Sequence, residues 1–169
     1  MQVDVVDEKD VVIGQEEENV CHEKKLWHRI AIVFIFKDDS YTQILLQRRA
    51  PNLRRAKEKF GLPGGHLQAG ETYLQGMLRE LHEEMLVNSW LPAVDITPLF
   101  KSIYEQHKEH FLAYRLTYSG PFNIDKKEVE SYGFYPLREL LKDIEVHPEK
   151  YSGLCCQLLK EYKARCLRG

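Results

Sequence analysis

The chain has 169 residues, of which 43% are hydrophobic and 30% are charged. This composition is typical of a globular protein and excludes wholesale disorder and collagen-like repeats. The longest strongly apolar run, residues 30–36, is far shorter than the roughly 18–20 residues of a membrane-spanning helix. The 24 basic and 26 acidic residues give a net charge of -2, which argues against a protein that coats nucleic acid but allows one local phosphate site. We therefore expect a soluble, cytoplasmic protein with a single domain over residues 1–169, no membrane association and no stable nucleic-acid complex.

The N-terminus and the cysteines agree with that compartment. Residues 1–7 contain no basic segment followed by an apolar core, so no secretory signal is expected. Cys21 stands alone, and Cys155, Cys156 and Cys166 fall on one expected C-terminal helix. The sequence has no Cys-x-x-Cys pair, and adjacent cysteines do not readily bind one zinc ion together. We expect four reduced thiols, because nothing near these positions pairs a cysteine locally with a base that would make it a nucleophile.

The first third of the chain predicts a hairpin followed by two strands. Residues 3–6 and 11–13 are β-branched runs on either side of a polar turn, so residues 1–27 are expected to form an N-terminal hairpin and its lead-in. Residues 29–36 are almost all bulky and apolar, which is typical of a strand covered on both faces. A second strand is predicted over residues 41–47, after a polar turn.

Two segments of unusual composition follow the second strand. Residues 48–59 carry six basic residues and one acid, and Pro51 and Asn52 interrupt any regular element there, so we predict a basic loop. Such a loop is suited to contact phosphate groups, and a solvated loop is the alternative. Residues 61–65 hold three glycines and a proline, a composition that demands special backbone geometry.

A helix is predicted over residues 71–87. Its apolar residues recur at spacings of three and four and form one stripe that we expect to face the core. They are Leu74, Met77, Leu78, Leu81 and Met85. Gly76 is unfavourable inside a helix, so we expect it to permit the close approach of another element.

The rest of the chain mixes strands and helices. Strands are predicted over residues 94–104, 110–118 and 133–135, and helices over residues 136–143 and 152–168. Because the elements do not follow a strict strand–helix–strand order, we predict an α+β domain built as an α/β/α sandwich.

Three glutamates on the predicted helix carry the chemical signal. Glu80, Glu83 and Glu84 stand at positions i, i+3 and i+4, so their carboxylates share one face, which we expect to point away from the apolar stripe. A hard divalent cation such as Mg²⁺ or Mn²⁺ prefers oxygen ligands and relieves their mutual repulsion. Arg79 precedes Glu83 by four residues and is placed to orient one carboxylate. A solvated acidic helix face is the alternative, but the neighbouring glycine turn and basic loop favour a cation site.

The stretch over residues 65–87 resembles the Nudix box, the pattern G-x5-E-x7-R-E-U-x-E-E-x-G-U in which U is bulky and apolar. The matching residues are Gly65, Glu71, Arg79, Glu80, Leu81, Glu83, Glu84 and Val87. Leu86 stands where the family usually has glycine, which concerns the end of the helix and none of the carboxylates. The resemblance predicts the Nudix fold, a mixed β-sheet between helices.

The resemblance also implies an activity, the hydrolysis of a nucleoside diphosphate linked to another moiety. It implies Mg²⁺ or Mn²⁺ as cofactor and a small-molecule diphosphate, a nucleotide derivative, as substrate. The implied metal ligands are Glu80, Glu83, Glu84 and the carbonyl of Gly64. The implied catalytic residues are Glu83, as a ligand or as the base that activates water, Arg79 and Glu80, with Glu71 in a structural role. The expected substrate-binding residues are Arg48, Arg49 and His66.

Many family members place another glutamate on a later loop. Glu109, Glu128 and Glu130 are the candidates in this chain. Glu128 is preferred because DKKEVE precedes the GFYPL strand, a context in which the family often has an acid. A surface charge run is the alternative.

The segments around the box resemble the branch of the family related to isopentenyl-diphosphate isomerase. The similar segments are VDVVDEKDVVIG, LWHRIAIVFIF, ILLQRR and GGH. In the isomerases, histidines and glutamates bind an additional metal, and a cysteine beside the box glycine is required. His28 and His66 match the histidine positions, and His22 matches more loosely. Gly64 replaces the cysteine, and His107 and Glu109 are candidates to replace the isomerase glutamate pair.

Three functions follow from the resemblance. A divalent-cation-dependent hydrolase of a diphosphate bond is preferred. Isomerase chemistry would require Cys21 to reach the site, since Gly64 offers no thiol. A non-catalytic nucleotide-sensing domain usually lacks a box glutamate, and this chain has all of them. Dimers are common in the family, so a homodimer is left open.

Overall fold

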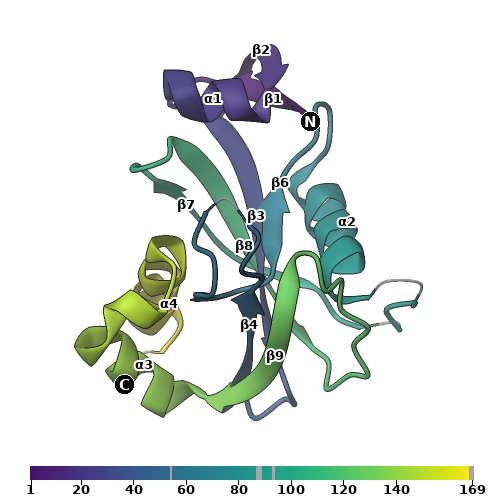
Figure 1. The fold of residues 1–169 in the computed structure, drawn as a ribbon, viewed down its shortest axis with the longest axis vertical. Coiled ribbons are helices and arrows are strands. Elements are labelled where there is room, and N and C mark those ends of the chain that lie inside the picture. The colour runs from purple at the N-terminus through teal and green to yellow at the C-terminus, as the bar shows by residue number, and fades with distance from the viewer. Residues whose placement is uncertain (54, 87–88, 93, 168–169) are drawn as a thin grey trace.

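The computed structural model describes all residues except 54, 87–88, 93 and 168–169. The strands are β1 (Gln2–Val6), β2 (Val12–Glu17), β3 (His28–Phe36), β4 (Gln43–Arg49), β5 (Phe60–Gly61), β6 (Gly64–His66), β7 (Thr97–Tyr104), β8 (Glu109–Thr117) and β9 (Val129–Pro136). The helices are α1 (Glu18–Lys24), α2 (Tyr73–Met85), α3 (Leu137–Val146) and α4 (Gly153–Cys166), with a 3₁₀ turn over Pro148–Lys150. Figure 1 shows their arrangement.

The central sheet is mixed. β3 and β8 pair in parallel, from His28 opposite Glu109 to Phe36 opposite Thr117. The other pairs are antiparallel and join β8 to β7, β3 to β6 and β4, and β4 to β5 and β9. β6 pairs with the first half of β3. β4 pairs with β3 only at Phe36, the last residue of β3, which lies opposite Ile44. β6 and β4 therefore share one edge of β3, and β8 occupies the other.

β3 is buried on both faces, as its apolar sequence predicts. On one face Phe34 and Phe36 belong to a core that α3 and α4 cover. On the other face Val33 and Ile35 belong to a core that α2 covers. In Figure 1, α2 accordingly lies on one side of the sheet and α3 and α4 lie on the other. The predicted α+β fold, a mixed sheet between helices, is confirmed.

The N-terminal hairpin is also confirmed, since β1 and β2 pair as a separate two-stranded sheet. The sequence does not predict α1, because its residues ENVCHEK show no apolar stripe and bury only Cys21. It does not predict β5 and β6 either, because strands of two and three residues are too short to show a period. None of the helices in the described part of the chain is long and apolar enough to span a membrane.

The expected orientation of α2 is confirmed for Met77, Leu81 and Met85, which are buried, but it is wrong for the other two apolar residues. Leu74 and Leu78, assigned to the core-facing stripe, are 42% and 37% exposed. The buried residues of α2 are Gly76, Met77, Leu81, Glu84 and Met85. Glu84 therefore points into the protein and not away from it, because the loop before the helix and β6 cover this face.

Glycine and capping residues explain how α2 is placed. A Cβ atom at Gly76 would lie 2.7 Å from Cγ of Leu67, so the glycine admits the preceding loop, as expected. The helix begins at Tyr73 because Thr72 and Gln75 form a capping box, with the Thr72 hydroxyl accepting from the Gln75 amide. At its other end Leu86 has a φ of -130°, a conformation that needs no glycine. The last box residue, Val87, lies outside the described residues.

The cysteines are free thiols, as expected from the sequence. Cys21 and Cys155 are buried, and burial raises the pKa of both thiols. A raised pKa lowers the thiolate fraction, so neither cysteine is activated as a nucleophile.

Asp10 attaches the N-terminal hairpin to the main sheet. It lies in the turn between β1 and β2, with a positive φ of 65°. Its carboxylate accepts from Arg29 Nε of β3 at 2.5 Å and from the Tyr73 hydroxyl of α2 at 3.0 Å. Lys101 of β7 donates to the same carboxylate. One nearly buried side chain thus holds the hairpin against three elements of the domain.

We expect Asp10→Asn to lower the free energy of unfolding by about 2 kcal/mol, because it removes the closer of the two ion-pair partners of the partly buried Arg29 and leaves only Asp4, at 3.9 Å. Asparagine tolerates the positive φ, so the loss reports the charge. Urea denaturation measures the change, and Glu8→Gln, an exposed acid in the same turn, is the control. Equal stability of the two variants would contradict the assigned role of Asp10.

Candidate active site and adjoining histidine cluster

Strand β6 lies between two groups of polar side chains and comes very close to β3. Gly64 has a φ of +139°, and a Cβ atom there would lie 2.2 Å from the carbonyl oxygen of Ala31. A Cβ atom at Gly65 would lie 2.5 Å from Oε2 of Glu80. The two glycines therefore permit different contacts, since Gly64 allows the strands to approach and Gly65 leaves room for the Glu80 carboxylate.

Arg79 organises the exposed side of the box. Its guanidinium donates to both oxygens of Glu71, at 2.8 and 2.9 Å. Nη1 donates to Glu80 at 2.7 Å and to Glu83 at 3.0 Å, and Nη2 donates to the backbone oxygen of His66 at 2.7 Å. These hydrogen bonds raise the pKa of Arg79, so it stays charged and holds three carboxylates against β6.

Glu84 is the buried member of the carboxylate group. Its side chain is 3% exposed, and its Oε2 accepts from Gln47 Nε2 at 3.0 Å and from the Gly64 amide at 3.4 Å. Burial, with the charge of Glu80 added, raises the pKa of Glu84 to about 8. Burial likewise raises the pKa of Glu80. Two adjacent carboxylates, one buried and one partly buried, whose ionisation is opposed in this way fit a divalent cation, which stabilises the charged form of both.

The three later acids occupy three different places. Glu128 lies near the box carboxylates, since its charge contributes to the raised pKa of Glu84. Burial raises the pKa of Glu128 itself, with smaller contributions from Asp125 and Glu83. Glu130 pairs with Arg48 at 3.1 Å, and Glu109 lies in the histidine cluster described below. Of the three candidates, the structure brings Glu128 to the box.

The two arginines at the end of β4 differ in their surroundings. Arg48 forms ion pairs with Glu130 at 3.1 Å and with Glu58 at 3.8 Å. Arg49 instead acts on Glu84 and Glu128. Burial raises the pKa of both carboxyls, and the positive charge of Arg49 partly offsets that rise. Successive strand residues point to opposite faces, so only Arg49 shares the face of Gln47 and the box.

Three histidines and one glutamate form a second group at the other end of β6. His22 comes from α1, His28 from the start of β3, His66 from β6 and Glu109 from the start of β8. One ligand atom from each lies within 4.8 Å of all the others. Nε2 of His66 lies 3.1 Å from Nε2 of His22 and 3.5 Å from Oε1 of Glu109. We call these four residues the histidine cluster.

The histidine cluster combines mostly neutral imidazoles with one carboxylate. Burial lowers the pKa of His22 to about 3, and burial also lowers the pKa of His28. Burial disfavours charge on Glu109, but hydrogen bonds from His107 and His66 outweigh it and lower the pKa of Glu109 to about 2. Burial alone would lower the pKa of His66, but Glu109 and Glu18 raise it. Neutral imidazoles and an ionised carboxylate are the forms that bind metal ions.

Sequence reasoning missed part of this arrangement. His22 matched the isomerase pattern only loosely. The sequence also did not predict the helix α1 that carries it, because its residues show no apolar stripe. Gln47 was not singled out, although a glutamine that directly follows the apolar residues 44–46 of a strand is a usable signal when that part of the strand is buried.

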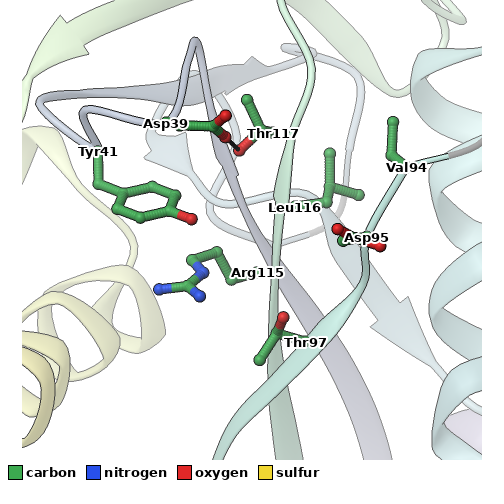
Figure 2. Close-up of a pocket in the computed structure, with 8 residues that line it drawn as sticks. All are labelled: Asp39, Tyr41, Val94, Asp95, Thr97, Arg115, Leu116 and Thr117. Carbon is green, nitrogen blue, oxygen red and sulfur yellow. Dashed lines mark hydrogen bonds between the residues drawn. The ribbon is translucent and has the colours of Figure 1, made fainter.

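A further pocket lies away from both groups. It has a volume of about 290 Å³ and lies at the far end of β3 and β8 from the histidine cluster (Figure 2). Two pairs of its side chains contact each other: Thr117 donates to Asp39 at 2.9 Å, and Arg115 lies over the Tyr41 ring at 4.3 Å. The pocket contains no member of the box or of the histidine cluster.

Comparison with known families decides the relationship. The sequence profile of the NUDIX domain matches residues 26–154. The chain belongs to the Nudix family. The predicted identification as a Nudix-type hydrolase is thereby confirmed at the level of the family. Residues 1–25, with His22, lie outside the matched part, so a single Nudix domain over 1–169 stays a prediction.

Individual Nudix relatives include both classes weighed above. An uncharacterized Nudix hydrolase of Streptomyces coelicolor is 32% identical over 146 residues, which cover 82% of this chain and 76% of that relative. Isopentenyl-diphosphate Delta-isomerase 2 of Aromatoleum aromaticum is 27% identical over 174 aligned residues, which cover 99% of this chain and 90% of that relative. The crystal structure of DR0079 from Deinococcus radiodurans has a TM-score of 0.81 at 23% identity, covering 95% of this chain and 98% of that one.

We expect the metal-free protein to lose stability relative to Glu84→Gln as pH rises from 5.5 to 7.5. In this window the folded state keeps the Glu84 proton, with a pKa of about 8, while the unfolded chain has released it at about 4.5. The unfolded state then binds fewer protons, so the free energy of unfolding falls by roughly 1.4 kcal/mol per pH unit for this group.

Urea denaturation in EDTA at several pH values measures this difference, and Glu139→Gln, an exposed acid on α3, is the control. Mg²⁺ is expected to stabilise the wild type more at pH 7.5 than at pH 5.5, because it binds the ionised carboxylate. A constant difference between wild type and Glu84→Gln across this range would contradict the raised pKa.

Proposed function

We propose that the protein is a divalent-cation-dependent hydrolase that cleaves the diphosphate bond of a small molecule, a nucleoside diphosphate linked to another moiety. The observation that carries the proposal is a pair of carboxylates, the buried Glu84 and the partly buried Glu80, held against β6 with Arg79 on one side and Gln47 on the other. Family membership supports the reaction class.

In this proposal the cation is Mg²⁺ or Mn²⁺, held by Glu80, Glu83, Glu84 and the carbonyl of Gly64. When bound, it neutralises diphosphate charge and makes a coordinated water more acidic. Arg79 keeps Glu80 and Glu83 oriented through its hydrogen bonds.

A proton acceptor for the attacking water is required beside the cation. Glu83 and Glu128 are the two carboxylates that fit this role. Glu83 is 53% exposed on α2 and is oriented by Arg79. Glu128 is also exposed, but burial of its carboxyl and the neighbouring acids raise its pKa.

Substrate phosphates are assigned mainly to Arg49, whose charge acts on the box side of β4. His66 remains a candidate, since it lies on β6 between the box and the histidine cluster. Arg48 is the weakest of the three candidates for binding phosphate, because its guanidinium is already paired with Glu130 and Glu58.

The geometry at Gly64 disfavours the isomerase alternative. A cysteine at this position would need a Cβ atom 2.2 Å from the Ala31 carbonyl oxygen and a φ of +139°. Cys21 is fully buried on α1, so its thiol does not substitute for the absent cysteine. The nucleotide-sensing alternative is disfavoured because the four box acids are all present. Arg79 orients Glu71, Glu80 and Glu83, and Gln47 and the Gly64 amide hold Glu84.

We expect Mg²⁺-dependent release of phosphate or monophosphate from at least one member of a panel of nucleoside di- and triphosphates, nucleotide sugars, dinucleotide cofactors and prenyl diphosphates. Glu84→Gln is expected to lower kcat by at least about 100-fold, because it removes a charged cation ligand. Glu139→Gln is the matched control on α3. Isomerisation of isopentenyl diphosphate without hydrolysis would overturn the hydrolase assignment.

We also infer that the histidine cluster holds a second metal ion. Ligands about 2.1 Å from a tetrahedral zinc ion lie roughly 3.4 Å apart. Three of the six separations lie close to this value, 3.1 Å for His22 to His66, 3.5 Å for His66 to Glu109 and 3.7 Å for His28 to Glu109, and all six are within 4.8 Å. Nε2 of His28 is buried, and no donor or acceptor in the described part of the chain pairs with it. Three imidazoles and a carboxylate suit Zn²⁺ or Mn²⁺.

We expect the wild type to retain one equivalent of Zn²⁺ that Glu109→Gln binds at least about tenfold more weakly, because the amide removes the only charged ligand of the cluster. Equilibrium dialysis with elemental analysis measures the bound metal. His147→Asn, which alters an exposed histidine, is the control. Equal zinc content in wild type and Glu109→Gln would refute the second site.

A further inference from the structure

Gln47 is a buried polar residue at the centre of the molecule. It lies on β4 and is 1% exposed. It stands two residues after Leu45, whose side chain belongs to the core under α2, so both side chains point to the same face of the sheet. Burying an amide in such a place costs free energy unless hydrogen bonds compensate for the lost water.

Only one half of the Gln47 amide is compensated within the described residues. Its Nε2 donates to Oε2 of Glu84 at 3.0 Å. Its Oε1 is buried, and no donor in the described part of the chain reaches it. An unpaired acceptor of this kind in a native structure points to a water or ligand that belongs there.

The contact with Glu84 falls on one oxygen. The amide of Gly64 donates to the same Oε2, at 3.4 Å, from the opposite strand of the site. Two donors from β4 and β6 therefore converge on Oε2 and leave Oε1 of Glu84 for another partner. Among neutral side chains of this length, glutamine is the one that offers both a donor for a carboxylate and an acceptor on the same group.

We propose that Gln47 is the positioning residue for Glu84: its Nε2 holds Oε2 so that Oε1 meets the cation, and its own Oε1 accepts a hydrogen bond from a water molecule of the site. The inference rests on the proposed hydrolase function and goes beyond the box, which contains no residue of β4. Gln47 touches neither substrate nor cation, so it acts only through Glu84 and the held water.

If Gln47 positions Glu84, its loss changes cation binding and turnover but not substrate binding. Gln47→Met keeps the length and volume of the side chain but removes both donor and acceptor. We expect it to weaken Mn²⁺ binding at the Glu84 site by about tenfold or more and to lower kcat by a similar factor. KM for the substrate is expected to stay within about twofold, because the residue does not contact the substrate.

Electron paramagnetic resonance of Mn²⁺, without substrate and at one pH, measures the affinity. The bound Mn²⁺ that counts is the part that Glu84→Gln removes, which separates it from ions bound at the histidine cluster.

Gln43→Met is the matched control, because Gln43 lies on the same strand and face but four residues, about 13 Å, from Gln47. Thermal unfolding checks that each variant is folded, and Gln47→Asn, whose amide is too short to reach Glu84, replaces Gln47→Met if the latter does not fold.

A double-mutant cycle separates positioning from general packing. If Gln47 acts through Glu84, Gln47→Met has little further effect on kcat in a Glu84→Gln background. An undiminished effect in that background, or wild-type Mn²⁺ affinity in Gln47→Met, would overturn the inference.

Failure of the proposed function is distinguishable from failure of this inference. If the wild type binds Mn²⁺ at Glu84 but hydrolyses no diphosphate in the panel, the hydrolase assignment fails while the Mn²⁺ affinities still decide the role of Gln47. If Glu84→Gln removes no bound Mn²⁺, the cation site itself is refuted, and the inference with it.

Discussion

The close approach of β6 to β3 is the constraint on which the rest of the site depends. At Gly64 the two backbones are so near that no side chain fits between them, and at Gly65 the space of a side chain is taken by the Glu80 carboxylate. This approach lets α2 turn Glu80 and Glu84 inward against β6. Burial then opposes the ionisation of both carboxylates, which is the condition that a divalent cation relieves.

The same short strand connects the two groups of ligands. The amide of Gly64 contacts Glu84 and Gly65 makes room for Glu80, whereas His66, the next residue, belongs to the histidine cluster. Arg79 reinforces the connection, because one guanidinium binds the box carboxylates and the backbone oxygen of His66. A displacement of β6 would therefore disturb both groups at once. The two proposed ion sites, which were inferred from different side chains, are thus both positioned by strand β6.

Local patterns in the sequence predicted a large part of this arrangement. The apolar run of β3 predicted a strand buried on both faces, and the spacing of Glu80, Glu83 and Glu84 predicted a shared helix face. The same spacing did not predict which face is buried. Leu74 and Leu78 continue the apolar period but remain exposed, because α2 packs against β3, β6 and the loop carrying Leu67 with its opposite face. The spacing of apolar residues shows which residues share a helix face. The elements packed around the helix decide which face is buried.

The sequence by itself determined the family, the mixed order of strands and helices, and the acids of the box, because these depend on residue type and spacing along one segment. The tertiary structure decided which distant residues join them. It brought Glu128 and not Glu109 or Glu130 to the box, placed Gln47 against Glu84, and gathered His22, His28, His66 and Glu109 from four elements. These contacts join residues far apart in the chain, and their geometry follows from the pairing of β3 with β6 and β8.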